Sequence, residues 1–145
     1  MKKLTKIVVV IMIMVCALSM LACSGTEGKV TLIVVGDDTK TYELNTTGKN
    51  LSTLQDLMDY LSQNEDFSYI ASGSFLTSVN GREADASSNE FWAIYTDLKI
   101  GDLPYYDSTW GTVTVNGVNY ASASKGITEL PLNKDTVYVL SLSSW

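Results

Sequence analysis

A short apolar segment at the N-terminus limits most strongly what this chain of 145 residues can fold into. Three lysines within the first six residues are followed by an apolar run from Ile7 to Val15, which continues to Ala22. A basic start and such a run are typical of a secretory signal peptide, and the run is short for a membrane-spanning helix. We therefore expect residues 1–22 to be removed on export, so that only the remainder folds.

The residue at which the apolar run ends indicates how the exported chain is held. The small residue Ala22 stands immediately before Cys23, an order that resembles the lipobox of bacterial lipoproteins. The resemblance implies that the Cys23 thiol receives diacylglycerol, and that acyl chains such as palmitate then anchor the protein stably to the membrane. We expect a cell-membrane lipoprotein on the extracytoplasmic face, with residues 23–28 as tether. An ordinary secretory signal is the alternative.

The composition of the expected mature chain excludes several classes of function. Its only cysteine is Cys23 and it has no histidine, so neither a disulfide nor Ser-His-Asp catalysis, Cys-His catalysis or a His-rich zinc site can form. No base is identifiable beside a serine or threonine, and the sequence therefore predicts a protein that is not an enzyme. Seven basic against 16 acidic residues give the mature chain a charge of −9, which argues against nucleic acid as a partner.

The apolar pattern predicts one strand-rich domain, residues 29–145, with a single helix. Leu54, Leu57, Met58 and Leu61 have helical spacing between residues 50 and 63, and Ser52 with Gln55 is a candidate capping box. Apolar and β-branched runs on both sides of this helix predict strands. The expected strands cover residues 30–35, 39–44, 75–79, 91–96, 113–115, 118–120 and 136–142.

The order of these elements predicts the fold class. Asn116-Gly117 is the strongest hairpin signal, because this dipeptide tolerates the positive φ angles of a type I′ turn. Residues 97–110 contain Gly101 and Pro104 and predict an insertion loop. We expect an α+β, β-grasp-like fold, in which one amphipathic helix packs on one face of a strand-rich mixed sheet.

Aromatic side chains are the candidate ligand-binding residues. Alternation along the strand sends Trp92 to one face and Tyr95 to the other, and at least one of these faces must pack in the core. Tyr105, Tyr106 and Trp110 lie in the expected loop and have less reason to be buried, so they are the better candidates for contacting a ligand or a protein.

Carboxylates are weaker candidates for a metal site. Asp97, Asp102 and Asp107 recur through the expected loop and could supply oxygen ligands to Ca²⁺, but the loop lacks the ligand spacing of an EF-hand. Asp37-Asp38 is interpreted as a solvated turn. The sequence therefore predicts no metal and no resident cofactor.

Two motifs connect the domain with a known family. Leu76-Thr77-Ser78-Val79-Asn80-Gly81, followed by Phe91-Trp92-Ala93-Ile94-Tyr95, resembles the paired motifs of the transcobalamin C-terminal-like domain family of exported bacterial lipoproteins. The resemblance covers residues 30–142 and implies a β-grasp fold. In vitamin B12 carriers the equivalent domain covers a corrin ring that a separate helical domain holds, and this chain has no such helical domain. The family motif residues look chiefly structural.

Two functions follow as the main hypotheses, and a third is a Ca²⁺-stabilised domain, which predicts that a chelator lowers the melting temperature. The first is a lipid-anchored, non-enzymatic binding protein whose ligand is a corrinoid, a vitamin B12-like molecule, or a similar flat amphipathic molecule that it passes to a transporter. The second is a cell-envelope adhesion or protein-interaction module, in which Tyr105, Tyr106 and Trp110 contact the partner. Concavity separates them: a ligand binder needs these aromatics in a pocket, whereas an interaction module needs them on an open patch.

Overall fold

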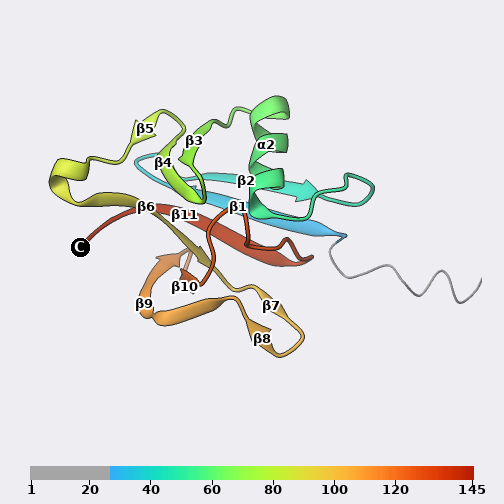
Figure 1. Cartoon of the computed structure of the whole chain (residues 1–145). Helices are drawn as coiled ribbons and strands as arrows, with labels where there is room; N and C mark the ends of the chain where they lie inside the picture. The colour runs from blue at the N-terminus through green and yellow to red at the C-terminus, as the bar shows by residue number, and fades with distance from the viewer. Residues whose placement is uncertain (1–26) are drawn as a thin grey trace, which may run out of the picture.

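A computed structural model describes residues 27–145, which fold around one six-stranded sheet (Figure 1). The only α-helix among these residues is α2, Leu54–Asn64, and one turn of 3₁₀ helix covers Ala86–Ser88. The strands are β1 Lys29–Val35, β2 Lys40–Asn45, β3 Tyr69–Ser72, β4 Phe75–Val79, β5 Arg82–Glu83, β6 Glu90–Thr96, β7 Lys99–Ile100, β8 Leu103–Pro104, β9 Tyr106–Val115, β10 Val118–Ala123 and β11 Thr136–Ser144. The protein is thus α+β, as the sequence predicts.

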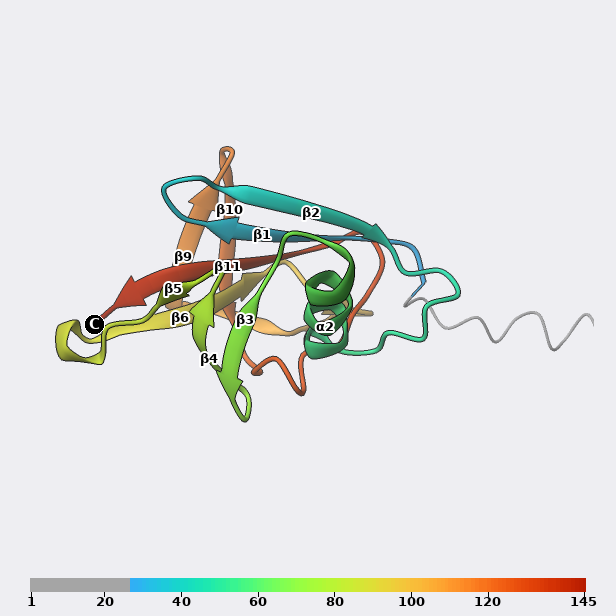
Figure 2. The ribbon, with the colours of Figure 1, turned by 90° about the horizontal axis from the view of Figure 1, so that it is seen from above.

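The main sheet is mixed and has the strand order β2-β1-β11-β6-β10-β9. One pair of neighbours is parallel: β11 lies beside β1 with Val30 opposite Thr136. The other neighbours are antiparallel. The strands β3, β4 and β5 form a small second sheet, and β7 with β8 forms a separate hairpin. Helix α2 and the small sheet lie on one side of the main sheet, and the β9–β10 hairpin lies on the other (Figures 1 and 2).

Helix α2 begins one residue later than the sequence pattern suggests. Thr53, not Ser52, is the N-cap: its hydroxyl accepts a hydrogen bond from the Asp56 N–H, and the Asp56 carboxylate accepts one from the Thr53 N–H. The expected Ser52–Gln55 box is therefore wrong. Ser52 still contributes, because its N–H and its hydroxyl both donate to the Asp56 carboxylate. The predicted stripe is confirmed, and its four apolar side chains are buried against the sheet.

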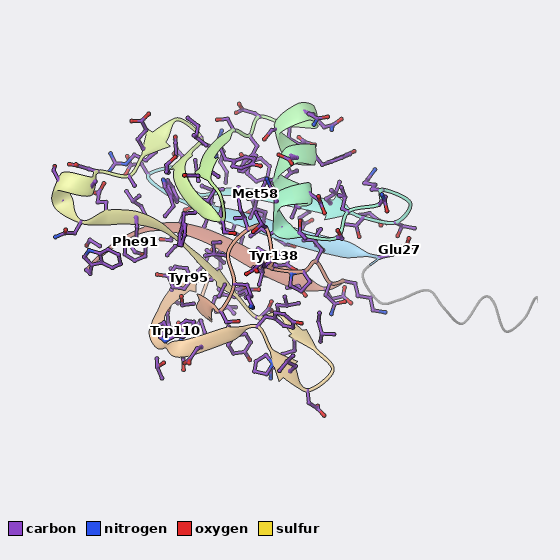
Figure 3. The ribbon with its side chains drawn as sticks, viewed as in Figure 1. Glu27, Met58, Phe91, Tyr95, Trp110 and Tyr138 are labelled. Carbon is purple, nitrogen blue, oxygen red and sulfur yellow. The ribbon has the colours of Figure 1, made fainter. Side chains whose placement is uncertain are left out.

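The face of the sheet that carries the helix holds the larger core. Leu32 and Tyr138 are fully buried there, next to apolar side chains from α2 and from the segment 127–132. The Tyr138 hydroxyl donates to the Pro131 carbonyl over 2.7 Å and accepts from the Asn133 N–H, and burial raises the pKa of Tyr138. In Figure 3, Met58 lies on this side of the sheet and Trp110 on the other.

The opposite face has a smaller core, because the β9–β10 hairpin bends across it. Val115 and Tyr120 of the hairpin pack on Ile33 and Val139. The bend follows a break in the ladder: Ala121 pairs with Thr112 but Ser122 pairs with Asp107, so residues 108–111 of β9 bulge out without partners in β10. A cover on both faces explains why Trp92 and Tyr95, which point to opposite sides, are both buried.

Further sequence predictions are confirmed, and a second one is wrong. Both predicted hairpins form, and Asn116 and Gly117 have the positive φ angles of 51° and 79° that their turn requires. The expected insertion loop, residues 97–110, is instead mostly strand: it contains the β7–β8 hairpin and the first half of β9. Strand β3 was not predicted at all.

The expected signal peptide, the lipidated Cys23 and most of the expected tether lie outside the described residues. Within residues 27–145 no helix is long and apolar enough to cross a membrane.

Candidate ligand-binding site

A hollow lies at one end of the main sheet, between two tight turns. The strand register places Val35 beside Ser141 and Leu142 beside Trp92, which forms the floor. The β1–β2 turn closes one side with Gly36, Asp37 and Asp38, and the β4–β5 turn closes the other with Asn80 and Arg82. We call this hollow, about 560 Å³ in volume, the turn hollow.

Trp92 fixes the floor of the turn hollow. Its indole N–H donates to the Arg82 carbonyl over 3.0 Å, and only 7% of the residue is exposed. This hydrogen bond connects β6 of the main sheet to β5 of the small sheet. The Trp92 ring is packed and its one polar group is hydrogen-bonded. Trp92 therefore supplies a rigid apolar surface to the floor of the turn hollow.

The β4–β5 turn is fixed by a polar network around Asn80. Asn80 and Ser68 exchange two hydrogen bonds: the Asn80 N–H donates to the Ser68 carbonyl, and the Ser68 N–H donates to the Asn80 side-chain oxygen. The Asn80 amide also donates to the Tyr42 hydroxyl over 3.3 Å, and that hydroxyl donates to the Asp66 carbonyl. Asn80 adopts a positive φ of 49°, which asparagine tolerates well.

The charged groups of the turn hollow are unequally paired. Lys40 binds Asp66 over 2.7 Å, and Arg82 lies 3.4 Å from Glu90. The hydrogen bond between Lys40 and Asp66 lowers the pKa of Asp66 and raises that of Lys40, with a smaller contribution to the latter from the charge of Asp38.

Neither acidic side chain of the β1–β2 turn has such a partner. Asp37 and Asp38 make no hydrogen bond and no salt bridge with any residue from 27 to 145. Because both basic groups of the turn hollow are already paired, its uncompensated charge is negative. The hollow therefore favours a ligand that brings N–H donors or positive charge.

A second hollow of about 440 Å³ lies on the other side of Trp92. It follows β6 between β4 and β10, where Leu76, Ile94 and Ala123 give it apolar walls. Phe75 lies at its rim and is largely exposed. We call it the strand hollow. Trp92 is the wall that the two hollows share.

Only one of the five candidate aromatic residues lines a hollow. Trp92 lines both, whereas Tyr95 is buried on the opposite face with its hydroxyl 2.9 Å from the Ser143 hydroxyl. Tyr105 and Tyr106 are half-buried, and Tyr105 packs on the core beneath the helix. Trp110 is 65% exposed on the bulge of β9. The five residues are not brought together.

The three aspartates that were considered for calcium do not converge. Asp97 accepts a hydrogen bond from the Val137 N–H, and Asp107 accepts from the N–H and the hydroxyl of Thr109. These bonds from Thr109 lower the pKa of Asp107. Asp102 lies in the β7–β8 turn. Within the described part of the chain no three acidic or cysteine side chains form a group that could hold a metal ion.

Sequence reasoning missed most of the turn hollow. The sequence around Asp37 and Asp38 predicts only a solvated turn. No pattern in the neighbouring residues indicates that this turn faces Arg82 across a hollow. The two turn motifs, Gly36-Asp37-Asp38 and Asn80-Gly81, are the signal that the sequence offers for this site. They reach the same end of the main sheet only through the parallel pairing of β1 with β11, which no local pattern predicts.

Comparison with known proteins relates the fold, but not the sequence, to two binding proteins. No protein-family model and no curated protein matches the chain. A solved structure from Ruminococcus gnavus ATCC 29149, described as a "putative metal binding protein", is 20% identical with a TM-score of 0.52, over 82% of this chain and 99% of that one. Haptocorrin in complex with Cbi is 12% identical with a TM-score of 0.57, over 84% of this chain.

The similarity to haptocorrin covers only part of that protein. This chain spans about a quarter, 26%, of the haptocorrin chain. At such identities the likeness shows a shared fold, in agreement with the fold that the resemblance to transcobalamin C-terminal-like domains implies. The first description assigns metal binding only as putative, and the second names Cbi as the bound molecule.

Proposed function

We propose that this protein is a lipid-anchored extracytoplasmic binding protein, without enzymatic activity, that takes a corrinoid or a similar flat amphipathic ligand into the turn hollow and passes it to a transporter. The observation that carries the proposal is the hollow itself. Its volume of about 560 Å³ lies within the range of about 300–1,000 Å³ that small-molecule sites occupy. The fold likeness to haptocorrin in complex with Cbi supports the choice of ligand class.

The lining of the turn hollow suits an amphipathic molecule with many amide groups. Trp92 and Leu142 offer apolar contact on the floor, while Asp37, Asp38 and Asn80 offer oxygen acceptors at the walls. Amide N–H groups on the rim of a flat ring would satisfy these acceptors, and an anionic ligand would be repelled by them. Because this chain corresponds to only part of haptocorrin, the ligand is held more weakly or is shared with a second subunit.

The first test is a titration of the protein with cobalamin and with a corrin precursor, followed by tryptophan emission and by calorimetry. Saturable binding with quenching is expected. The substitution Gly36→Trp should abolish it by filling the mouth. A Cβ atom at Gly36 meets no atom within 4 Å, so the backbone there accepts a side chain and the fold should stay intact. The matched control is Ser108→Trp on the exposed bulge of β9, which should bind as the parent does. Equal binding by both variants would refute the turn hollow as the site.

The membrane anchor is tested separately. If Cys23 carries the diacylglyceryl group, the parent chain sediments with the membrane fraction and the substitution Cys23→Ala releases it. A Cys23→Ala chain that remains attached would refute the anchor without touching the ligand proposal.

A second function, the envelope adhesion or protein-interaction module, is favoured by the position of Trp110. This side chain is 65% exposed on the bulge of β9 and lines neither hollow, as an open-patch contact requires. If no corrinoid binds, and if Trp110→Ala removes binding of the chain to intact cells, the interaction module replaces the ligand carrier.

A further inference from the structure

We propose that the end of the domain at which the chain enters the fold rests on the membrane surface, with the β7–β8 hairpin as its contact. This inference depends on the proposed anchor at Cys23, but not on the identity of the ligand. We call this end the anchor end; it comprises residues 27–29, 46–50, 97–104 and 133–135.

Hydrogen bonds hold the parts of the anchor end together. The Thr46 N–H donates to the Gly28 carbonyl and the Asp135 N–H donates to the Lys29 carbonyl, over 2.8 and 2.7 Å. The Asn133 amide donates to the Lys99 carbonyl over 3.2 Å, which joins the β7–β8 hairpin to the same end. Figures 1 and 2 both place the start of β1 on this side of the molecule.

The tether between the anchor and this end is short. From Cys23 to Glu27 the chain has four residue steps and spans at most about 14 Å when fully extended. Lipid chains at Cys23 therefore keep the anchor end close to the headgroups. The turn hollow lies at the other end of β1, about 20 Å away for a seven-residue strand.

The β7–β8 hairpin presents apolar side chains at the anchor end. Ile100 and Leu103 lie opposite each other across the hairpin, and they are 42% and 60% exposed. The hairpin belongs to neither of the other sheets, and its base is held by the fully buried Leu98, whose carbonyl accepts from the Tyr105 N–H. A rigid base with an apolar tip is suited to contact the interface of a bilayer.

The distribution of charge between the two ends of the domain also favours contact of the anchor end with a membrane. The anchor end holds four of the seven basic residues of the mature chain, Lys29, Lys49, Lys99 and Lys134. Four acidic residues, Glu27, Asp97, Asp102 and Asp135, balance them, so the net charge of this end is zero. The opposite end carries only Lys40 and Arg82 against seven acidic residues, namely Asp37, Asp38, Glu65, Asp66, Glu83, Asp85 and Glu90. A surface of anionic lipid therefore repels the hollow-bearing end and tolerates the anchor end.

The test measures depth in the bilayer at single labelled cysteines of the full lipidated chain. Cys16 leaves with the signal and the Cys23 thiol carries lipid, so Ile100→Cys and Leu103→Cys each provide one free thiol for a fluorescent label. The chain is reconstituted into vesicles of phosphatidylcholine and phosphatidylglycerol that contain a spin-labelled lipid quencher. The matched control is Ser144→Cys, which is exposed and lies at the opposite end, paired with Glu90.

The outcomes separate this inference from the proposed function. Quenching at positions 100 and 103 that exceeds quenching at position 144 by about twofold or more supports the membrane contact. Equal quenching at all three positions in a membrane-bound chain overturns it and leaves both anchor and ligand proposals intact. A chain that is not recovered with vesicles overturns the anchor and this inference together, whereas loss of corrinoid binding alone bears only on the turn hollow.

Discussion

The two faces of the main sheet are buried by different means. On one face, α2 and the segment 127–132 complete a cluster of 17 buried apolar side chains among the described residues. On the other face the cluster has six, and its cover is the bent hairpin of β9 and β10. The larger core is built by elements that pack with their whole length, whereas the smaller core depends on one hairpin that leaves the sheet at a bulge.

Because of this difference, substitutions on the helix face should affect the stability of the whole domain, whereas substitutions on the hairpin face should affect the hairpin alone. A side chain lost from the helix face weakens the contact between helix and sheet, and this contact contains most of the buried apolar side chains of the described residues. A side chain lost from the hairpin face weakens only the attachment of a two-stranded ribbon, which can open while the rest stays folded. Both hollows lie against the helix face or the edge of β6, so ligand binding should follow the first face and not the second.

The largest expected effect comes from the helix face. Leu57 is 1% exposed in α2, and Leu57→Ala should reduce the free energy of unfolding by about 2–5 kcal/mol, because it removes buried methyl groups and leaves a cavity. Denaturant unfolding followed by circular dichroism measures the loss, which should be cooperative. A loss below about 1 kcal/mol would mean that the helix face does not carry the stability.

A matched truncation on the hairpin face should cost less and act locally. Val115 is buried in the smaller cluster, and Val115→Ala removes about two methylene equivalents, or about 1.5 kcal/mol. Hydrogen exchange should show faster exchange of amides in residues 112–121, with β1 and β11 still protected. Uniformly faster exchange across the sheet would break the distinction between the two faces.

The cap of the helix gives a smaller, pH-dependent effect. Burial opposes ionisation of Asp56, but hydrogen bonds from Ser52 and Thr53 outweigh it and lower the pKa of the Asp56 carboxyl group. A lowered pKa stabilises the fold above the unfolded value, near 3.9, and this stabilisation is lost as the pH falls through the folded value.

The substitution Asp56→Asn tests the cap. It should cost about 1 kcal/mol at neutral pH, and the difference from the parent should shrink as the pH falls below about 4. Unfolding curves at both pH values measure this. A difference that is unchanged in acid would mean that the charge of Asp56 contributes nothing.

The smallest effect is expected at the bulge. Trp110 is mostly exposed, so Trp110→Ala should change the free energy of unfolding by less than about 0.5 kcal/mol. It should also leave corrinoid binding unchanged, since Trp110 lines neither hollow. A calorimetric titration that shows weakened binding would move the ligand from the helix face to the hairpin.

The sequence predicts the helix face better than the hairpin face, for a physical reason. The stripe from Leu54 to Leu61 and the alternation around Trp92 are local patterns, and each one alone indicates which side chains turn inward. The crossing of the β9–β10 hairpin depends on four extra residues, 108–111, whose place in the ladder is decided by pairing with β10. No local pattern in that segment distinguishes such a bulge from a loop.

The same reasoning applies to the candidate site. The sequence predicts Trp92 as a candidate because it stands in a recognisable strand motif. That motif does not indicate that Trp92 lines both hollows. Asp37 and Asp38 could not be identified, because their position opposite Arg82 results from strands that are far apart in the sequence. The sequence predicts exposed side chains at Tyr105 and Tyr106, but in the structure both are partly buried.

The parallel pair of β1 and β11 has a consequence for the timing of folding. Val30 in β1 pairs with Thr136 in β11, so the contact closes a loop of more than 100 residues, and β11 also separates β1 from β6. A chain that emerges from its N-terminus can form the β1–β2 hairpin early, but the six-stranded sheet stays open until β11 arrives. Until then β1 and β2 cannot join β6, β10 and β9 in one sheet, so the fold is completed only by the last strand of the chain.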